Sequence, residues 1–218
     1  MTVESISTFG NEVDSLFLII LIVTGFAFVL TEGLLIYFLI RYRHRDGSKA
    51  RYIHGNRQVE ILWTLVPGLM LFGLAIYQTG AWQLIRQILP AESEALVIAV
   101  EARQFEWHPT YPGADGRLGT DDDIEAPINV IQVPVNRKVI VRLSADDVLH
   151  SFFVPALRVK QDAVPGRPIS LWFEATKVGQ YEIACTELCG LGHYRMRAFL
   201  TVAEPADFEA WLAEIEAR

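Results

Sequence analysis

Cys185-Thr186-Glu187-Leu188-Cys189-Gly190-Leu191-Gly192-His193-Tyr194-Arg195-Met196 is the stretch around which this sequence is organised. It holds two thiols, an imidazole and a thioether, and its two cysteines are the only ones in the 218-residue chain. A further imidazole, His150, lies upstream in Asp147-Val148-Leu149-His150-Ser151-Phe152. Thiolate, imidazole and thioether groups are soft or borderline ligands of the kind that hold copper in proteins. The stretch therefore predicts a copper site and a fold that brings His150 to the cysteines.

The number of thiols suggests how many metal ions this site holds. A blue-copper site needs one cysteine, two histidines and a weak methionine. This chain has one thiolate more, and two thiolates can bridge two ions. Each ion would then take one imidazole, His150 or His193, while Met196 and the main-chain oxygen of Glu187 fill the weak positions. Such a centre cycles by one electron, so the pattern predicts electron transfer. A disulfide between the two cysteines is the alternative.

The pattern C-x-E-x-C-x3-H-x2-M, with D-V-L-H-S-F upstream, resembles the copper A site of cytochrome c oxidase subunit II. The segment 157–167 resembles the same family, and the similarity extends over nearly the whole chain. The resemblance implies two copper ions bridged by both thiolates, with the ligands His150, Cys185, Glu187, Cys189, His193 and Met196. It also implies that the carboxylate of Glu187 reaches a magnesium ion shared with the catalytic subunit.

Two apolar runs precede this region. Leu16 to Ile40 contains one charge, Glu32, and Ile61 to Ile85 contains none. As a helix, each run would be about 37 Å long, against about 30 Å for the hydrocarbon core of a bilayer. We therefore expect a two-helix transmembrane hairpin, with helices over about 15–41 and 59–88. A cleaved signal peptide fits the first run poorly, because the run is too long and an acidic segment precedes it.

The connector between the runs, residues 42–57 with Arg41 at its edge, sets the predicted orientation. It is strongly basic and contains one acid, Asp46; its basic residues are Arg41, Arg43, Arg45, Lys49, Arg51 and Arg57. By the positive-inside rule this loop is cytoplasmic. The N-terminus and everything after about residue 90 then lie on the periplasmic side. We expect an integral protein of a bacterial plasma membrane.

Residues 91–218 form the second predicted domain, after the N-terminal segment and hairpin of residues 1–90. Short runs with strand composition alternate there with turn residues, and they cover 96–102, 128–133, 138–143, 151–154, 169–174, 180–184 and 198–202. About seven short strands favour a β-sandwich. The resemblance implies a cupredoxin-like Greek-key barrel. The end of the chain, from Pro205, predicts a short amphipathic helix, because apolar residues recur there at helical spacing.

Glu60 and Glu32 are acids in or beside the apolar runs. Glu60 lies in the first turn of the second helix, where the helix dipole favours an anion. The resemblance instead implies that Glu60 marks the cytoplasmic mouth of a proton pathway into the catalytic subunit. Glu32 lies in mid-membrane and is expected to face another protein rather than lipid.

The chain departs from the family at Gln104-Phe105-Glu106-Trp107, where the mitochondrial-type pattern is Q-W-Y-W. Phe105 takes the place of the tryptophan through which electrons arrive, so Phe105 and Trp107 are the candidates for that role. Asp147 matches an acid of the usual donor-docking face. We expect a basic donor, most simply a c-type cytochrome. The acidic loop 115–125 is interpreted as a solvated face, since its spacing does not match a calcium loop.

The predicted function is that of the electron-accepting subunit of a haem–copper cytochrome c oxidase. It would pass electrons from cytochrome c through copper A to the catalytic subunit, subunit I, where dioxygen is reduced. Other oxidase subunits and membrane lipid are the remaining expected partners, and nucleic acid is not. One alternative is a membrane-tethered copper chaperone, which needs only C-x3-C and a distant histidine. Another is a copper-free quinol oxidase subunit of the same fold, which the intact ligand set disfavours.

Overall fold

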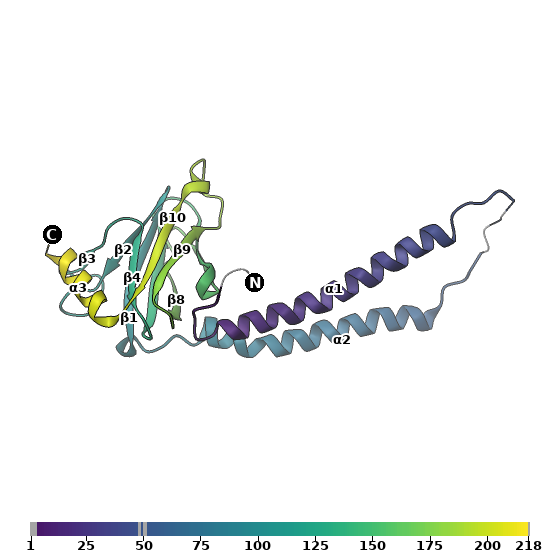
Figure 1. Ribbon diagram of the computed structural model, residues 1–218, viewed down its shortest axis with the longest axis horizontal. Helices are drawn as coiled ribbons and strands as arrows, with labels where there is room; N and C mark the ends of the chain where they lie inside the picture. The colour runs from purple at the N-terminus through teal and green to yellow at the C-terminus, as the bar shows by residue number, and fades with distance from the viewer. Residues whose placement is uncertain (1–3, 48, 50–51, 218) are drawn as a thin grey trace. The chain divides into compact units, whose positions relative to one another are not determined.

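The computed structural model describes residues 4–47, 49 and 52–217 (Figure 1). Arg51, one of the basic residues of the predicted cytoplasmic loop, lies outside the described residues. The chain divides into two compact units. One is a helical hairpin, Glu12–Trp82, and the other combines Met1–Asn11 with Gln83–Arg218. The second unit thus takes its chain from both sides of the hairpin.

The hairpin consists of α1, Gly10–Arg41, and α2, Arg57–Trp82, which continues as a short π-helix, η1, Gln83–Gln87. The mean hydropathy of the most apolar window is 2.6 in the first helix and 2.0 in the second, and neither window is buried within the chain. So much exposed apolar surface is unfavourable in water, so these helices need lipid or other proteins around them.

Asn56 caps the start of α2. Its side-chain oxygen accepts hydrogen bonds from the backbone N–H groups of Gln58 and Val59, at 3.0 and 3.3 Å. This is the usual way in which a helix satisfies its first free N–H groups. Asn56 thus fills the side-chain capping role, and Glu60 is left to contribute only its charge at this helix end.

The N-terminal segment belongs to the β-rich unit. Ile6 and Phe9 are each 1 % exposed. The N–H of Ile6 donates to the carbonyl of Ala156 at 2.8 Å, and the N–H of Thr176 donates to the carbonyl of Ile6 at 2.7 Å. The ring of Phe9 meets Trp172 edge-on, with centroids 5.4 Å apart. Both ends of the hairpin therefore join the same unit.

Two five-stranded sheets form the β-rich unit (Figure 1). The first has the order β3-β2-β1-β5-β8, with bounds Ile124–Glu125, Glu106–Tyr111, Ala95–Arg103, Lys138–Ala145 and Ile169–Glu174. The second has the order β4-β10-β9-β6-β7, with bounds Val130–Pro134, Arg197–Ala203, Gly179–Cys185, His150–Val154 and Val159–Ala163. The pairs β1–β5 and β4–β10 are parallel, and the other pairs are antiparallel.

The structure confirms the predicted β-sandwich preceded by two apolar helices. Each of the seven predicted runs overlaps a strand, and α3, Pro205–Glu216, is the predicted C-terminal helix. In α3 Phe208 and Ile215 are buried, and the helix lies against β3 and β4 (Figure 1).

Three further strands, β2, β3 and β7, do not appear in the sequence prediction. β2 contains Pro109, which weakens a strand pattern, and the middle of β7 is the polar Lys160-Gln161-Asp162. Pairing with β1 and β6 holds these two strands in place.

Candidate metal centre

Strand pairing brings the predicted ligands together. β6 begins at His150 and β9 ends at Cys185, and the two strands pair antiparallel with Phe152 opposite Cys185. The N–H of Cys185 donates to the carbonyl of Met196 at 3.1 Å, which closes the base of the loop between β9 and β10. A histidine 35 positions away in sequence therefore lies at the mouth of the cysteine loop.

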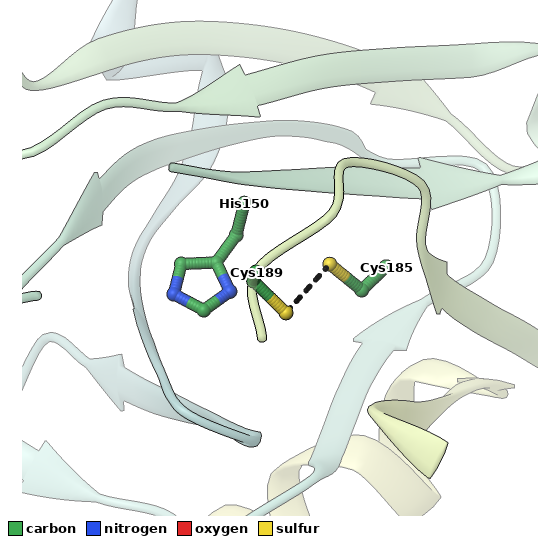
Figure 2. Close-up of side chains that lie close together, drawn as sticks. All are labelled: His150, Cys185 and Cys189. Carbon is green, nitrogen blue, oxygen red and sulfur yellow. Dashed lines mark hydrogen bonds between the residues drawn. The ribbon is translucent and has the colours of Figure 1, made fainter. Parts of the chain in front are cut away.

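Figure 2 shows the side chains of His150, Cys185 and Cys189 close together. Their metal-binding atoms all lie within 4.8 Å of one another, and all three residues are buried. The two sulfur atoms are 3.8 Å apart, and both cysteines are free thiols. The disulfide alternative therefore does not describe this structure.

The remaining predicted ligands surround the same sulfur atoms. The sulfur of Cys189 lies 3.6 Å from Nδ1 of His193 and 3.8 Å from the sulfur of Met196. The thiol of Cys185 lies 3.3 Å from the main-chain oxygen of Glu187. Two sulfurs thus lie at the centre of a group that includes every atom predicted to bind copper.

The surroundings of His150 indicate that this cluster of side chains suits a metal ion. Its side chain is fully buried, and Nε2 lies 2.8 Å from Oδ1 of Asp147. Its other nitrogen, Nδ1, has no hydrogen-bond partner among the residues that the structure describes. An unpaired buried polar atom is costly, so it calls for an explanation. A metal ion at Nδ1 would satisfy it, and sulfur with imidazole is a donor set that suits copper.

Asp147 fixes the ring of His150. Burial acts to raise the pKa of Asp147, but hydrogen bonds from His150 and from the backbone N–H groups of Val148 and Gln104 outweigh it, so the pKa lies below its ordinary value. The ionised carboxylate therefore holds Nε2–H of His150 and leaves Nδ1 for a metal. Gln104 also donates from its side chain to the carbonyl of Cys189 at 2.5 Å. The sequence did not predict this second role of Asp147 or the contact of Gln104, although the spacing D-x2-H was visible.

The thiol of Cys189 is protonated before any metal arrives. Burial, followed by the neighbouring Cys185, raises the pKa of Cys189 to about 12. A neutral thiol is the favoured form in this apolar surrounding. A cation that binds here must therefore displace a proton, and it would stabilise the thiolate in return.

Phe105 covers the loop, whereas Trp107 lies inside the unit. A Cβ added at Gly192 would lie 2.4 Å from the Phe105 ring, so the ring packs directly on this glycine. Phe105 is partly exposed, and the guanidinium of Arg195 lies 5.8 Å from its ring centre. Trp107 is fully buried, with its ring centroid 6.3 Å from that of His150. Of this pair, only Phe105 has exposed surface.

Apolar side chains stand exposed on the same loop. Leu188 is 78 % exposed, Leu191 is 98 % and Tyr194 is 82 %. The carboxylate of Glu187 has no interaction with any other described residue, although its main-chain oxygen faces Cys185. Glu60 belongs to the other compact unit, so it is not part of this cluster.

Two family models match the chain. Residues 97–202 match the model described as cytochrome c oxidase subunit II, periplasmic domain, and residues 3–79 match its transmembrane domain. Both matches concern the oxidase subunit, and they extend over the helices as well as the β-rich unit. They weigh against the copper-chaperone alternative, which shares neither part.

Similar proteins agree with the family models. The alternative cytochrome c oxidase subunit 2 of Bradyrhizobium diazoefficiens is 30 % identical, over 96 % of this chain and 82 % of that protein. Cytochrome c oxidase subunit 2 of Thermostichus vulcanus is 32 % identical, over 98 % of this chain and 78 % of that protein. The crystal structure of the periplasmic domain of subunit II (CoxB) of Bradyrhizobium japonicum matches 60 % of this chain and 98 % of that one, with a TM-score of 0.50 and 30 % identity.

Proposed function

Because this chain belongs to the cytochrome c oxidase subunit II family, we propose that its cysteine loop and His150 hold the copper A centre through which electrons enter the oxidase. The chain is a subunit of a haem–copper terminal oxidase, an enzyme complex, and has a periplasmic domain in addition to its apolar helices. The observation that carries the proposal is the buried, unpaired Nδ1 of His150 beside two free thiols. Dioxygen reduction belongs to another subunit.

Six residues are assigned to the copper centre. Cys185 and Cys189 would hold the two ions as thiolates, and His150 and His193 would each supply an imidazole. Met196 and the main-chain oxygen of Glu187 would serve as weak ligands, and both lie close to the sulfurs. When bound, two copper ions in this environment provide a one-electron couple with little change in geometry. The buried sandwich supplies rigidity, since both strands that carry ligands are paired on both sides.

The donor arrives at the exposed side of the cysteine loop. Phe105 and the neighbouring Leu191 and Tyr194 offer apolar contact there, and acids near the start of β6 offer a charge that attracts a basic protein. A c-type cytochrome is the simplest such donor. Trp107 is assigned to packing beside His150 rather than to donor contact, because it has no exposed surface.

Two carboxylates face partner subunits in this proposal. Glu187 reaches toward the catalytic subunit, where its carboxylate holds a shared magnesium ion, a hard cation that prefers oxygen ligands. Glu60 marks the mouth of a proton pathway on the cytoplasmic side, and side-chain capping by Asn56 leaves its carboxylate available for that role. The complex lies in a bacterial plasma membrane, with both hairpin helices in lipid or against other subunits.

The test measures copper content and copper spectra in the full chain. We expect two copper ions per chain, and an EPR hyperfine pattern from one unpaired electron shared by two equivalent copper nuclei. His150→Gln should abolish that pattern. His108→Gln is the matched control, because His108 is a partly buried imidazole paired with Glu106 at 3.0 Å, away from the cluster. A single-copper spectrum in the parent, or equal loss in both variants, would contradict the assignment.

A further inference from the structure

A cavity of about 340 Å³ lies between the starts of β1 and β5 and the loop that follows β2. Three arginines line it, Arg117, Arg137 and Arg142, and Glu92 is the one acid among its described lining residues. The rest of the lining is apolar or glycine. The cavity therefore carries two net positive charges.

The positive charge of this cavity is opposite in sign to the net charge of the surrounding domain. Residues 91–218 contain 12 basic and 20 acidic side chains, a net charge of −8. Arg142 is paired with Glu92 at 2.6 Å. Within the part of the chain that the structure describes, the guanidinium groups of Arg117 and Arg137 have no ion pair or hydrogen bond. Two cations thus line one cavity without an ion-pair partner among the described residues.

The acidic loop holds Arg117 in place. The carboxylate of Asp122 accepts from the N–H of Asp115 at 3.0 Å, and the carboxylate of Asp115 accepts from the N–H of Arg117 at 2.8 Å. A Cβ at Gly113 would lie 2.0 Å from the carbonyl oxygen of Asp122, so the loop closes on itself tightly. These acids support the cavity wall instead of lining the cavity.

We propose that this cavity binds a phosphate group through Arg117, Arg137 and Arg142. Guanidinium groups bind phosphate oxygens in pairs, and they are weakly hydrated, so they lose little on binding. Phosphate takes the place of the Glu92 carboxylate at Arg142, because a doubly charged anion attracts the three cations more strongly. The cavity has room for a second phosphate or an ester group.

The phosphate has two possible sources, a lipid headgroup and a soluble phosphate compound. Glu92 follows Gln87, the last residue of η1, by five positions, a reach of at most about 17 Å. Glu92, which lines the cavity, therefore follows a candidate membrane helix closely in sequence. Anionic lipid headgroups attract basic residues near a membrane.

The experiment has two arms, one for each source. In the soluble arm, which tests for a soluble phosphate compound, the full chain in detergent is titrated calorimetrically with inorganic pyrophosphate. Replacing both Arg117 and Arg137 by Gln should weaken binding at least about tenfold, since each loses a charge-assisted hydrogen bond. Glu92→Gln should tighten binding several-fold, because it removes the competing carboxylate. Arg197→Gln is the control: it removes one positive charge outside the cavity, at Arg197, which pairs with Glu182 on the other sheet. Its binding should match the parent.

The lipid arm measures phosphatidylglycerol retained by the chain in native mass spectrometry, with phosphatidylcholine as the neutral comparison. Selective retention that the double variant loses, without pyrophosphate binding, assigns the site to a headgroup. Pyrophosphate binding without lipid retention assigns it to a soluble compound, and both together support a site open to either. Binding in neither arm, or an equal loss in Arg197→Gln, would overturn the proposal.

Discussion

The carboxylate of Asp147 lies 2.8 Å from Nε2 of His150, and this contact decides which ring nitrogen is left for a metal. The same carboxylate accepts from the N–H of Gln104 at 2.8 Å and from the N–H of Val148 at 2.6 Å. Asp147 is therefore fixed by three hydrogen bonds, and it fixes His150 in turn. A residue that the sequence associated with donor docking also orients a copper ligand.

Asp147→Ala should weaken copper binding by about 10- to 100-fold, the usual cost of losing the partner that orients a metal-bound histidine. The measurement is competition for copper against a chelator of known affinity. Asp146→Ala is the matched control, because it removes the neighbouring acid, 61 % exposed and paired with Arg103, without touching His150. Equal affinities in the two variants would remove the orienting role of Asp147.

Electrostatic attraction of the donor is best tested by substituting acids other than Asp147, because Asp147 also orients His150. In the parent, the rate at which a basic c-type cytochrome reduces the copper centre should fall as salt rises, because salt screens charges over about 8–10 Å. Asp146→Asn combined with Glu106→Gln should lower that rate several-fold at low salt and converge with the parent at high salt. Stopped-flow kinetics measure both. A parent rate that stays constant or rises with salt would point to a neutral or acidic donor.

Gly192→Ala should destabilise the copper loop by about 1–3 kcal/mol, the cost of forcing an extra methyl group into packed surroundings. The new Cβ would meet the ring of Phe105 at 2.4 Å. Phe105→Ala in the same chain should recover most of that loss, because the ring is the obstacle. Thermal unfolding of the two single variants and the double variant measures this coupling. Additive losses would mean that the Phe105 ring does not pack on Gly192.

Copper uptake should depend on pH through Cys189. Its thiol is protonated across pH 6–8, because its pKa is raised to about 12. For each proton released on binding, the apparent copper affinity rises about tenfold per unit increase in pH.

In the copper-free chain, the raised pKa of Cys189 makes the free energy of unfolding fall as pH rises. The stability that it contributes is present below about pH 8.5, the ordinary thiol pKa, and is lost as pH rises toward about 12. Chelator competition and denaturant unfolding across pH measure the two effects, and a pH-independent affinity would contradict the first.

Glu60→Gln should slow turnover of the assembled oxidase about tenfold or more while leaving the copper spectrum unchanged. The reason is the loss of a proton-carrying group at the cytoplasmic mouth of the pathway. Asn56→Ala is the control, because it removes the cap of α2 and costs about 1 kcal/mol of stability without removing a titratable group. Proton uptake and oxygen consumption are the measurements. Full turnover in Glu60→Gln would return Glu60 to a role at the helix end.

The sequence alone determined the parts of this protein that depend on local pattern and on ligand chemistry. Two long apolar runs predict the helices, because only helices of that length satisfy their backbone groups in lipid. The six copper-ligand candidates follow from the types and spacing of residues around Cys185 and Cys189, with the family resemblance supplying the pattern. Alternating runs predict most strands of the sandwich. Each of these inferences needs residues that are close in sequence or belong to one recognisable motif.

The tertiary structure decided what depends on contacts between distant segments. β2 and β7 are strands because β1 and β6 pair with them, despite their polar residues and proline. The N-terminal segment packs into the β-rich unit because Ile6 and Phe9 find buried sites there. Phe105 packs on Gly192, and three arginines line one cavity, for the same reason. None of these contacts leaves a periodic pattern in the sequence, since each depends on how strands far apart along the chain come together.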